Sequence, residues 1–194
     1  VSPPQWQQPE TGRRILNPRK LHIGGARVEP ASAKTIDVIN PASEEVCQTI
    51  AAGSAVDVDS AVAAAKRAFV SFSQTTKAER LALLRRILEV YNSRLDEMAE
   101  AISAEMGAPL VMAKDSQAFC GTAHFEAAIA ALEAMEFEEQ RGKTRIVREG
   151  IGVCGLITPW NWPMNKIVTK VAPDIAAGCA MVIKKSELAP TNEL

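Results

Sequence analysis

The segment 153–183 places the strongest constraint on the fold of this chain. It contains a short apolar run at 153–157, a helical pattern at 164–177 that ends at Gly178, and a second apolar run at 180–183. A strand, a helix and a strand in this order form a βαβ unit, whose strands lie parallel and whose crossover is right-handed. Two parallel strands cannot bury both faces alone. We therefore expect a larger parallel sheet and a sequence that stops partway into a domain.

Glycines and turn residues predict antiparallel strands near the start of the chain. Gly24 and Gly25 lie between two short β-prone runs, which indicates a hairpin. Further β-prone runs at 35–39 and 45–50 extend this pattern into an antiparallel ribbon. Residues 1–20 are rich in Pro, Gln and Arg without periodicity, and we expect a mobile arm there.

Capping signals and apolar spacing predict helices across 55–143. Asp57 or Asp59 can cap the first helix, and Thr76 with Glu79 forms a capping-box pattern before the second. A third helical stretch should stop at Gly107. A further helix is expected at 114–136. Charged residues at and just beyond its end indicate a solvated helix face and loop; they are Glu133, Glu136, Glu138, Glu139 and Arg141. A strand is expected at 144–148.

Gly150, Gly152 and Gly155 have the G-x-G-x-x-G spacing of a dinucleotide-binding loop. In such a loop the glycines follow a strand and begin a helix, so that the helix N-terminus faces a pyrophosphate. Here they lead into the strand at 153–157 instead. We therefore assign them to close packing and a turn into the sheet, with a phosphate loop as the less favoured alternative.

The turn after that strand, TPWNWP at 158–163, is a better candidate for ligand binding. Ligands of open α/β sheets bind outside the carboxyl ends of the strands. Two prolines stiffen the turn, and we expect its two tryptophans to anchor it. The amide of Asn161 can donate two hydrogen bonds, which suits a developing oxyanion. The alternative is an asparagine that only closes the turn through its own backbone.

A second candidate site follows the next strand. Lys184 and Glu187 are three residues apart at its carboxyl end. A glutamate can accept both hydroxyls of a ribose, and a lysine adds a charge or a hydrogen bond. The alternative is that both side chains simply face solvent.

ITPWNWP followed by AAGCAMVIKKSELAP closely resembles the aldehyde dehydrogenase superfamily. The resemblance continues upstream through VINPASEEV, DVDSAVAAAKRAF and KAERLALLRRILEVY, so it covers residues 21–194. It implies an α/β fold in which an N-terminal β-ribbon and a helical region lead into the first βαβ unit of a Rossmann-like cofactor domain, truncated. The implied divisions are an arm at 1–20, a ribbon that contacts other subunits at 21–54, a helical region at 55–143 and the start of the NAD(P)-binding sheet at 144–194.

The resemblance also implies roles for individual residues. Asn161 matches the oxyanion-hole amide, and Lys184 and Glu187 match contacts to the adenosine ribose of the cofactor. Lys170 matches a lysine behind the catalytic centre. Positions that match backbone or packing contacts to the cofactor are Ile157, Thr158, Pro159 and Trp160. Positions that match the substrate tunnel are Trp162, Lys166 and Thr169.

Position 185 departs from the family pattern, which usually has proline after the ribose-binding lysine. Lys185 releases the restraint on φ that a proline would impose. Its charge favours a 2′-phosphate, whereas the Glu187 carboxylate would repel one. On balance we expect NAD as cofactor, with NADP as the alternative.

The family oxidises an aldehyde to a carboxylic acid with NAD(P)+ through a cysteine thiohemiacetal, and this chemistry needs residues that the sequence lacks. None of Cys47, Cys120, Cys154 and Cys179 matches the nucleophile position, and the general-base glutamate is absent. We therefore expect the chain to be inactive alone. The alternatives are a non-catalytic remnant or interaction fragment, or a parent enzyme that transfers the acyl group to coenzyme A.

Composition argues against several other classes of function. The net charge is −1 and no apolar run approaches the length of a membrane span, so we expect neither nucleic-acid nor membrane binding. The dispersed cysteines and two histidines predict no metal site and no disulfide framework in a cytoplasmic protein.

Strands at 21–50 and 144–148 need partners, and in the family comparable strands join subunits into a homodimer or homotetramer. The alternative is that the ribbon packs only on its own helical region.

Overall fold

The computed structural model describes residues 17–190, and its βαβ unit confirms the predicted parallel strands. Strand β7 (Val153–Ile157) leads through helix α6 (Pro163–Ala177) to strand β8 (Ala180–Lys184). The two strands pair in parallel from Val153 opposite Ala180 to Ile157 opposite Lys184. Helix α6 ends because Gly178 adopts a left-handed conformation, with φ of 79°, that other residues rarely accept.

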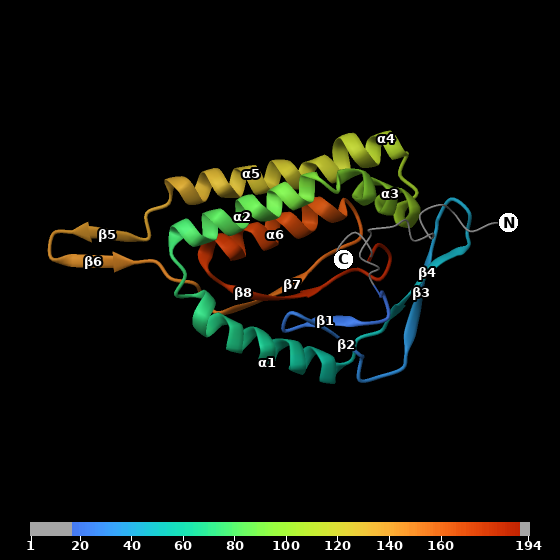
Figure 1. Cartoon of the computed structure of the whole chain (residues 1–194), viewed down its shortest axis with the longest axis horizontal. Coiled ribbons are helices and arrows are strands. Elements are labelled where there is room, and N and C mark those ends of the chain that lie inside the picture. The colour runs from blue at the N-terminus through green and yellow to red at the C-terminus, as the bar shows by residue number, and fades with distance from the viewer. Residues whose placement is uncertain (1–16, 191–194) are drawn as a thin grey trace.

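Helices cover both faces of the β7–β8 pair. Helix α1 (Ala55–Phe72) lies against one face and α6 against the other. Helices α2 (Lys77–Asn92) and α5 (Phe119–Ala134) pack on α6 in turn, so that the helical layer lies on one side of the strands (Figure 1). The apolar core lies mainly within this helical layer. Its buried members are Leu84, Tyr91, Ala99, Ile102, Ala113, Ala118, Phe125, Leu132, Met164, Ile167, Val168, Ala172 and Ile175.

The first two helices begin at capping boxes, one of which differs from the prediction. Thr76 caps α2 and Glu79 completes the reciprocal box, as expected. Helix α1, however, is capped by Ser54, so the assignment of Asp57 or Asp59 as the cap is wrong. Asp57 occupies the third helical position instead. There its carboxylate accepts hydrogen bonds from the backbone N–H groups of Ser54 and Ala31, both at 2.8 Å.

The third helical stretch is an independent helix, and the fourth starts differently from the prediction. Helix α3 (Leu95–Met106) ends at Gly107 as expected. The prediction of a single helix at 114–136 is wrong in its details. A short helix α4 (Leu110–Met112) and a π-helical turn η2 (Ala113–Ala118) precede α5. The hydroxyl of Tyr91 donates to the carbonyl of Ala118 at 2.6 Å, which gives this turn a side-chain partner on α2.

The remaining strands form three separate antiparallel hairpins. Strands β1 (Leu21–Ile23) and β2 (Ala26–Val28) pair, as do β3 (Thr35–Ile39) and β4 (Val46–Ala51), which confirms the strands of the predicted ribbon. Strand β5 (Glu138–Arg141) pairs with the expected strand β6 (Thr144–Val147) and projects from the body of the protein (Figure 1).

Strand β5 corrects one local prediction. Glu138, Glu139 and Arg141 lie on a strand rather than on a helix face or loop. Cross-strand ion pairs favour this arrangement, since Arg145 contacts Glu138 at 2.6 Å and Arg148 contacts Glu139 at 3.3 Å.

Two further expectations concern the ends of the chain and membranes. The arm predicted at 1–20 lies almost entirely outside the described residues. No helix within residues 17–190 has the length and apolar character needed to cross a bilayer.

The packing of Tyr91 on α5 predicts the effect of a substitution at Gly121. In most exposed helix positions alanine is more favourable than glycine by about 1 kcal/mol. A Cβ at Gly121 would collide with the Tyr91 ring and hydroxyl. We therefore expect Gly121→Ala to lower the free energy of unfolding by about 1–3 kcal/mol in chemical denaturation.

Gly53→Ala is the matched control, because no atom lies within 4 Å of the added Cβ. The packing argument would be contradicted if Gly121→Ala were as stable as that control.

Candidate functional site

The carboxyl ends of β7 and β8 meet at one edge of the sheet, as the sequence predicts. Ile157 lies opposite Lys184 in the parallel register. Just beyond β7, the backbone N–H of Thr158 donates to the carbonyl of Lys184 at 3.2 Å. This bond ties the start of the 158–163 turn to the end of β8. The two candidate segments are therefore neighbours.

Burial within the 158–163 turn is uneven. Thr158 is buried and Pro163 is fully buried at the first position of α6. The tryptophans do not anchor the turn by burial, so that expectation is wrong: Trp160 is 49% exposed and Trp162 is 37% exposed. The turn is held at its two ends, and its middle is presented to solvent.

Trp162 adopts a left-handed backbone conformation, with φ of 52°, immediately before α6. This region is unfavourable for a bulky residue and indicates local strain. Its carbonyl nevertheless accepts the first helical hydrogen bond, from Lys166 N–H at 3.1 Å. This geometry was not expected from the sequence. The available signal was Pro163, because a proline disfavours the right-handed helical conformation in the residue before it.

Asn161 is exposed and lies next to this strained residue. Among residues 17–190 its side chain makes no hydrogen bond, so nothing there supports the alternative that it closes the turn through its own backbone. An amide held in a short turn between fixed ends is a suitable donor to an oxygen that gains negative charge.

Lys184 and Glu187 form an ion pair at the same edge. Their side-chain atoms are 2.7 Å apart, and each side chain is about half exposed. The hydrogen bond from Lys184 and one from the backbone of Glu187 itself lower the pKa of the Glu187 carboxyl. The carboxylate is therefore ionised at neutral pH and can accept hydrogen bonds from hydroxyl groups.

The adjacent Lys185 points its ammonium to a different partner. Its Nζ atom donates to the carbonyl of Pro190 at 2.9 Å. Ser186 is buried next to it, and its hydroxyl accepts from the backbone N–H of Leu188 at 3.2 Å. These contacts fold the chain back after β8 and leave Lys184 and Glu187 at the outer surface.

Roles were predicted for three polar residues of α6, namely Lys166, Thr169 and Lys170. The side chains of Thr169 and Lys170 form hydrogen bonds within the helix. Lys170 donates to the carbonyl of Lys166 at 2.9 Å, and the Thr169 hydroxyl donates to the carbonyl of Asn165 at 2.7 Å. Lys166 and Lys170 are half-buried, while Thr169 is exposed.

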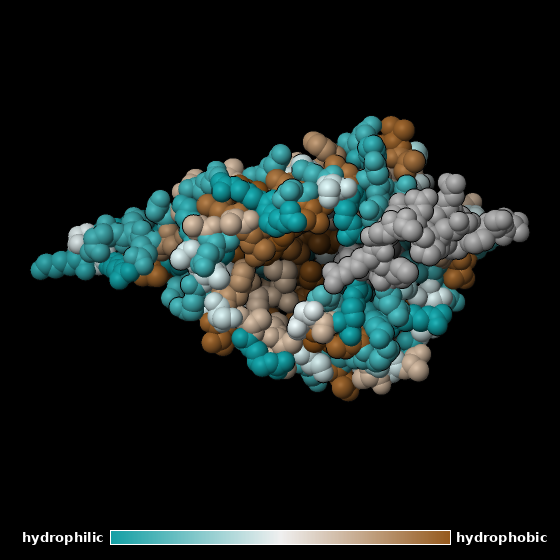
Figure 2. All heavy atoms as spheres, viewed as in Figure 1, coloured by the Kyte–Doolittle hydropathy of each residue, from teal (hydrophilic) through white to brown (hydrophobic). Residues whose placement is uncertain are grey.

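An apolar groove of about 410 Å³ lies elsewhere, between α2, α5 and α6. Tyr91, Phe125, Met164 and Val168 are among its lining residues, and Arg86 and Arg94 also border it. Figure 2 shows that hydrophobic side chains also reach the surface in the middle of the viewed face, between more polar upper and lower margins. The protein thus presents apolar surface as well as the polar edge of the sheet.

Three of the four cysteines lack the features of an activated nucleophile. Burial raises the pKa of the Cys47, Cys120 and Cys154 thiols, and for Cys154 it does so to about 11. A neutral thiol is a poor nucleophile. Cys154 also lies near the amino end of β7, away from the Asn161 turn.

Comparison with known proteins places this arrangement in a large set of similar chains. The model of the aldehyde dehydrogenase family matches residues 28–194. The chain is 52% identical to 3-succinoylsemialdehyde-pyridine dehydrogenase from Pseudomonas sp over 173 residues, which are 89% of this chain and 36% of that protein.

Solved structures agree with the sequence comparison. An aldehyde dehydrogenase from Bartonella henselae is 43% identical with a TM-score of 0.89, over 92% of this chain and 38% of that one. A mutant of aldehyde dehydrogenase C from Pseudomonas syringae, in complex with NAD+ and octanal, is 46% identical with a TM-score of 0.89, over 91% and 36% of the two chains. The chain therefore spans little more than a third of the length of the relatives it matches.

Proposed function

The chain belongs to the aldehyde dehydrogenase family, and from this premise we propose that it is the N-terminal, cofactor-contacting part of an enzyme that oxidises an aldehyde to a carboxylic acid with NAD(P)+. The observation that carries the proposal is the shared edge of β7 and β8. There the Asn161 turn and the Lys184–Glu187 pair lie side by side, because Ile157 is in register with Lys184. Ligands of open α/β sheets bind at such an edge.

Asn161 supplies the oxyanion-hole hydrogen bond in this proposal. Its amide is exposed beyond the sheet edge and has no partner among the described residues. The fixed turn holds the donor in place before the negative charge develops, so little reorganisation is needed. A donor of this kind stabilises the transition state more than the neutral carbonyl of the substrate.

Glu187 and Lys184 fit the adenosine ribose of the cofactor. The ionised Glu187 carboxylate can accept both ribose hydroxyls, and Lys184 orients it through their 2.7 Å contact. The same negative charge disfavours a 2′-phosphate, which supports NAD over NADP. Lys185, the residue that would favour the phosphate, donates to the Pro190 carbonyl instead. When bound, the cofactor accepts a hydride from the substrate-derived intermediate.

The surface next to this pair can pack against the same cofactor. Ile157 is 75% exposed and Trp160 is 49% exposed, so both present apolar area beside the strand ends. Thr158 and Pro159 lie between Ile157 and Trp160 in the chain and contribute backbone atoms to the same surface. The P. syringae relative is complexed with NAD+, which agrees with this assignment.

The exposed side of α6 is proposed to face the substrate. Trp162, Lys166 and Thr169 would line the entrance, and the two polar residues suit a polar aldehyde. Lys170, which is bonded to the Lys166 carbonyl, would lie behind the catalytic centre and help to handle protons.

Assembly is proposed to use the projecting hairpins. The β5–β6 hairpin extends from the body with its strands unpaired on their outer edges within the described chain (Figure 1). Such edges are usually paired or otherwise covered. A cytoplasmic homodimer or homotetramer could use this hairpin and the ribbon at 21–54 as contacts, with the helical region at 55–143 and the sheet at 144–194 forming the cofactor-binding domain.

Asn161→Ala tests the oxyanion role in the complete enzyme. We expect kcat to fall by a factor of about 10² to 10³, because one preorganised donor is lost from the transition state. Cofactor affinity should change little. Steady-state kinetics of Asn40→Ala, which changes a turn asparagine of the β3–β4 hairpin, provides the control. An unchanged kcat in Asn161→Ala would remove the oxyanion role.

Glu187→Gln tests the cofactor assignment. The loss of a charged hydrogen-bond acceptor should raise the Kd for NAD+ by about tenfold to a hundredfold, measured by fluorescence titration. Glu45→Gln, on the β3–β4 hairpin, should bind as the native enzyme does. If kcat changed while the Kd did not, the ribose assignment would be wrong.

The 194-residue chain alone is expected to have no aldehyde oxidation activity, since no cysteine matches the nucleophile position and burial raises the pKa of the Cys47, Cys120 and Cys154 thiols. The measurement is NADH formation by purified chain of verified mass, with several aldehydes. Turnover above a heat-denatured control would contradict this expectation and would identify one of the four cysteines as a nucleophile.

A further inference from the structure

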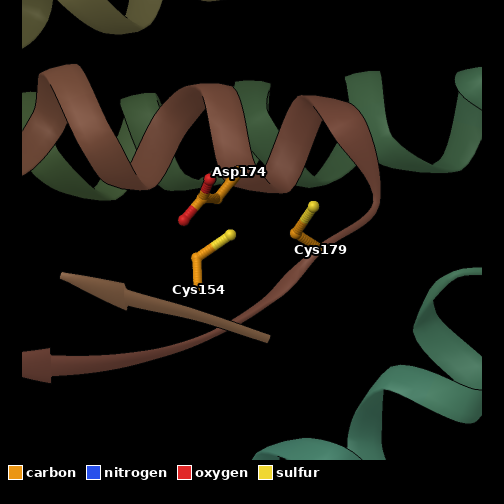
Figure 3. A group of neighbouring side chains, drawn as sticks. All are labelled: Cys154, Asp174 and Cys179. Carbon is orange, nitrogen blue, oxygen red and sulfur yellow. The ribbon is translucent and has the colours of Figure 1, made fainter. Parts of the chain in front are cut away.

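A cluster of three side chains lies at the end of the βαβ unit opposite the Asn161 turn. Cys154 comes from β7, Asp174 from the last turn of α6, and Cys179 from the residue before β8 (Figure 3). Their sulfur and carboxylate oxygen atoms all lie within 4.8 Å of one another. The Cys154 thiol donates a hydrogen bond to the Asp174 carboxylate. Three segments of the fold therefore converge on one small volume.

The hydrogen bonding of this cluster is incomplete. Atom Oδ2 of Asp174 is buried and has no hydrogen-bond partner among residues 17–190. Cys179 is only 4% exposed. A buried carboxylate oxygen without a partner is costly, since water no longer solvates it. An additional ligand would remove this cost.

Arg80 places a buried positive charge beside the cluster. Its side chain comes from α2, is 7% exposed, and has an Nε atom with no hydrogen-bond partner in the described chain. A Cβ at Gly178 would meet its Nη1 atom at 2.5 Å, so the guanidinium packs directly on the turn that carries Cys179. Buried charges are normally paired.

We propose that Cys154, Asp174 and Cys179 bind a soft divalent metal ion of the Zn²⁺ class. Two thiolates and one carboxylate are a ligand set that zinc accepts, and a water molecule can complete a tetrahedral site. The three ionised ligands and one dication leave a net charge of −1, which Arg80 offsets. The free oxygen of Asp174 and the buried positive charge of Arg80, whose guanidinium also stacks on the Phe137 ring, then both have a role.

The metal ion would act as a structural clamp, independent of the proposed catalysis. It would join the start of β7, the end of α6 and the start of β8, the far end of the unit from Asn161. Binding to the folded state alone would raise the stability of the protein. The competing interpretation is a disulfide between Cys154 and Cys179. It is less favoured because it would use neither the Asp174 oxygen nor the charge of Arg80.

Zinc titration of the purified, reduced and chelator-treated protein tests the proposal. We expect one Zn²⁺ bound per chain in competition with a chromophoric chelator, and a rise in Tm on zinc addition. Cys154→Ser, Cys179→Ser and Asp174→Asn should each weaken zinc binding at least about tenfold. Cys47→Ser and Asp37→Asn, outside the cluster, should bind as the native protein does.

Cobalt substitution supplies a readout that does not depend on the variants. If the site is correct, Co²⁺ bound to the native protein shows thiolate charge-transfer absorption, and one equivalent of Zn²⁺ abolishes it. The proposal is overturned if Co²⁺ gives no such absorption, or if Cys47→Ser weakens binding as much as Cys154→Ser does. It is equally overturned if mass spectrometry finds a Cys154–Cys179 disulfide and the reduced protein binds no zinc.

Discussion

The parallel register between β7 and β8 is the constraint on which both ends of the βαβ unit depend. It sets Val153 opposite Ala180 at one end and Ile157 opposite Lys184 at the other. Because side chains alternate between faces, a slip of one residue would reverse every position of β8 relative to α1 and α6. Buried Leu156 and Ala180 oppose such a slip. The neighbouring positions of the Asn161 turn and Glu187 therefore follow from burial along the strands.

Local signals in the sequence predicted most of the regular structure, and the errors have different physical causes. The Thr76–Glu79 box and the stop at Gly107 depend on residues close together in the chain, and both are confirmed. The cap of α1 was misassigned although its signal is local: Ser54 and Asp57 have the S-x-x-D spacing of a capping box, and Asp57 bonds Ser54 as well as the distant N–H of Ala31. Strand β5 was missed because its run of charged residues lacks the apolar alternation of a strand, while Glu138 and Glu139 find partners in Arg145 and Arg148 across the hairpin.

The two candidate sites also differ in whether a local sequence pattern could identify them. Asn161, Lys184 and Glu187 belong to short motifs at strand ends, so the sequence could identify them and the expected parallel pairing could bring them together. No local pattern joins Cys154 to Asp174 and Cys179, and the dispersed cysteines predicted no metal site. The α6 crossover is what brings these three residues together.

The two ends of the unit also differ in how they are packed, and this explains the glycine at position 150. A Cβ at Gly150 would lie 2.9 Å from the Gly178 carbonyl oxygen, so the backbone approaches the end of α6 at a distance that only glycine permits. Together with Arg80 against Gly178, this contact closes the amino end of the strands. The carboxyl end stays open, with Ile157 and Trp160 exposed. A closed end fixes the register of the strands, and the open end can then hold Asn161 and Glu187 in place for a ligand without being buried itself.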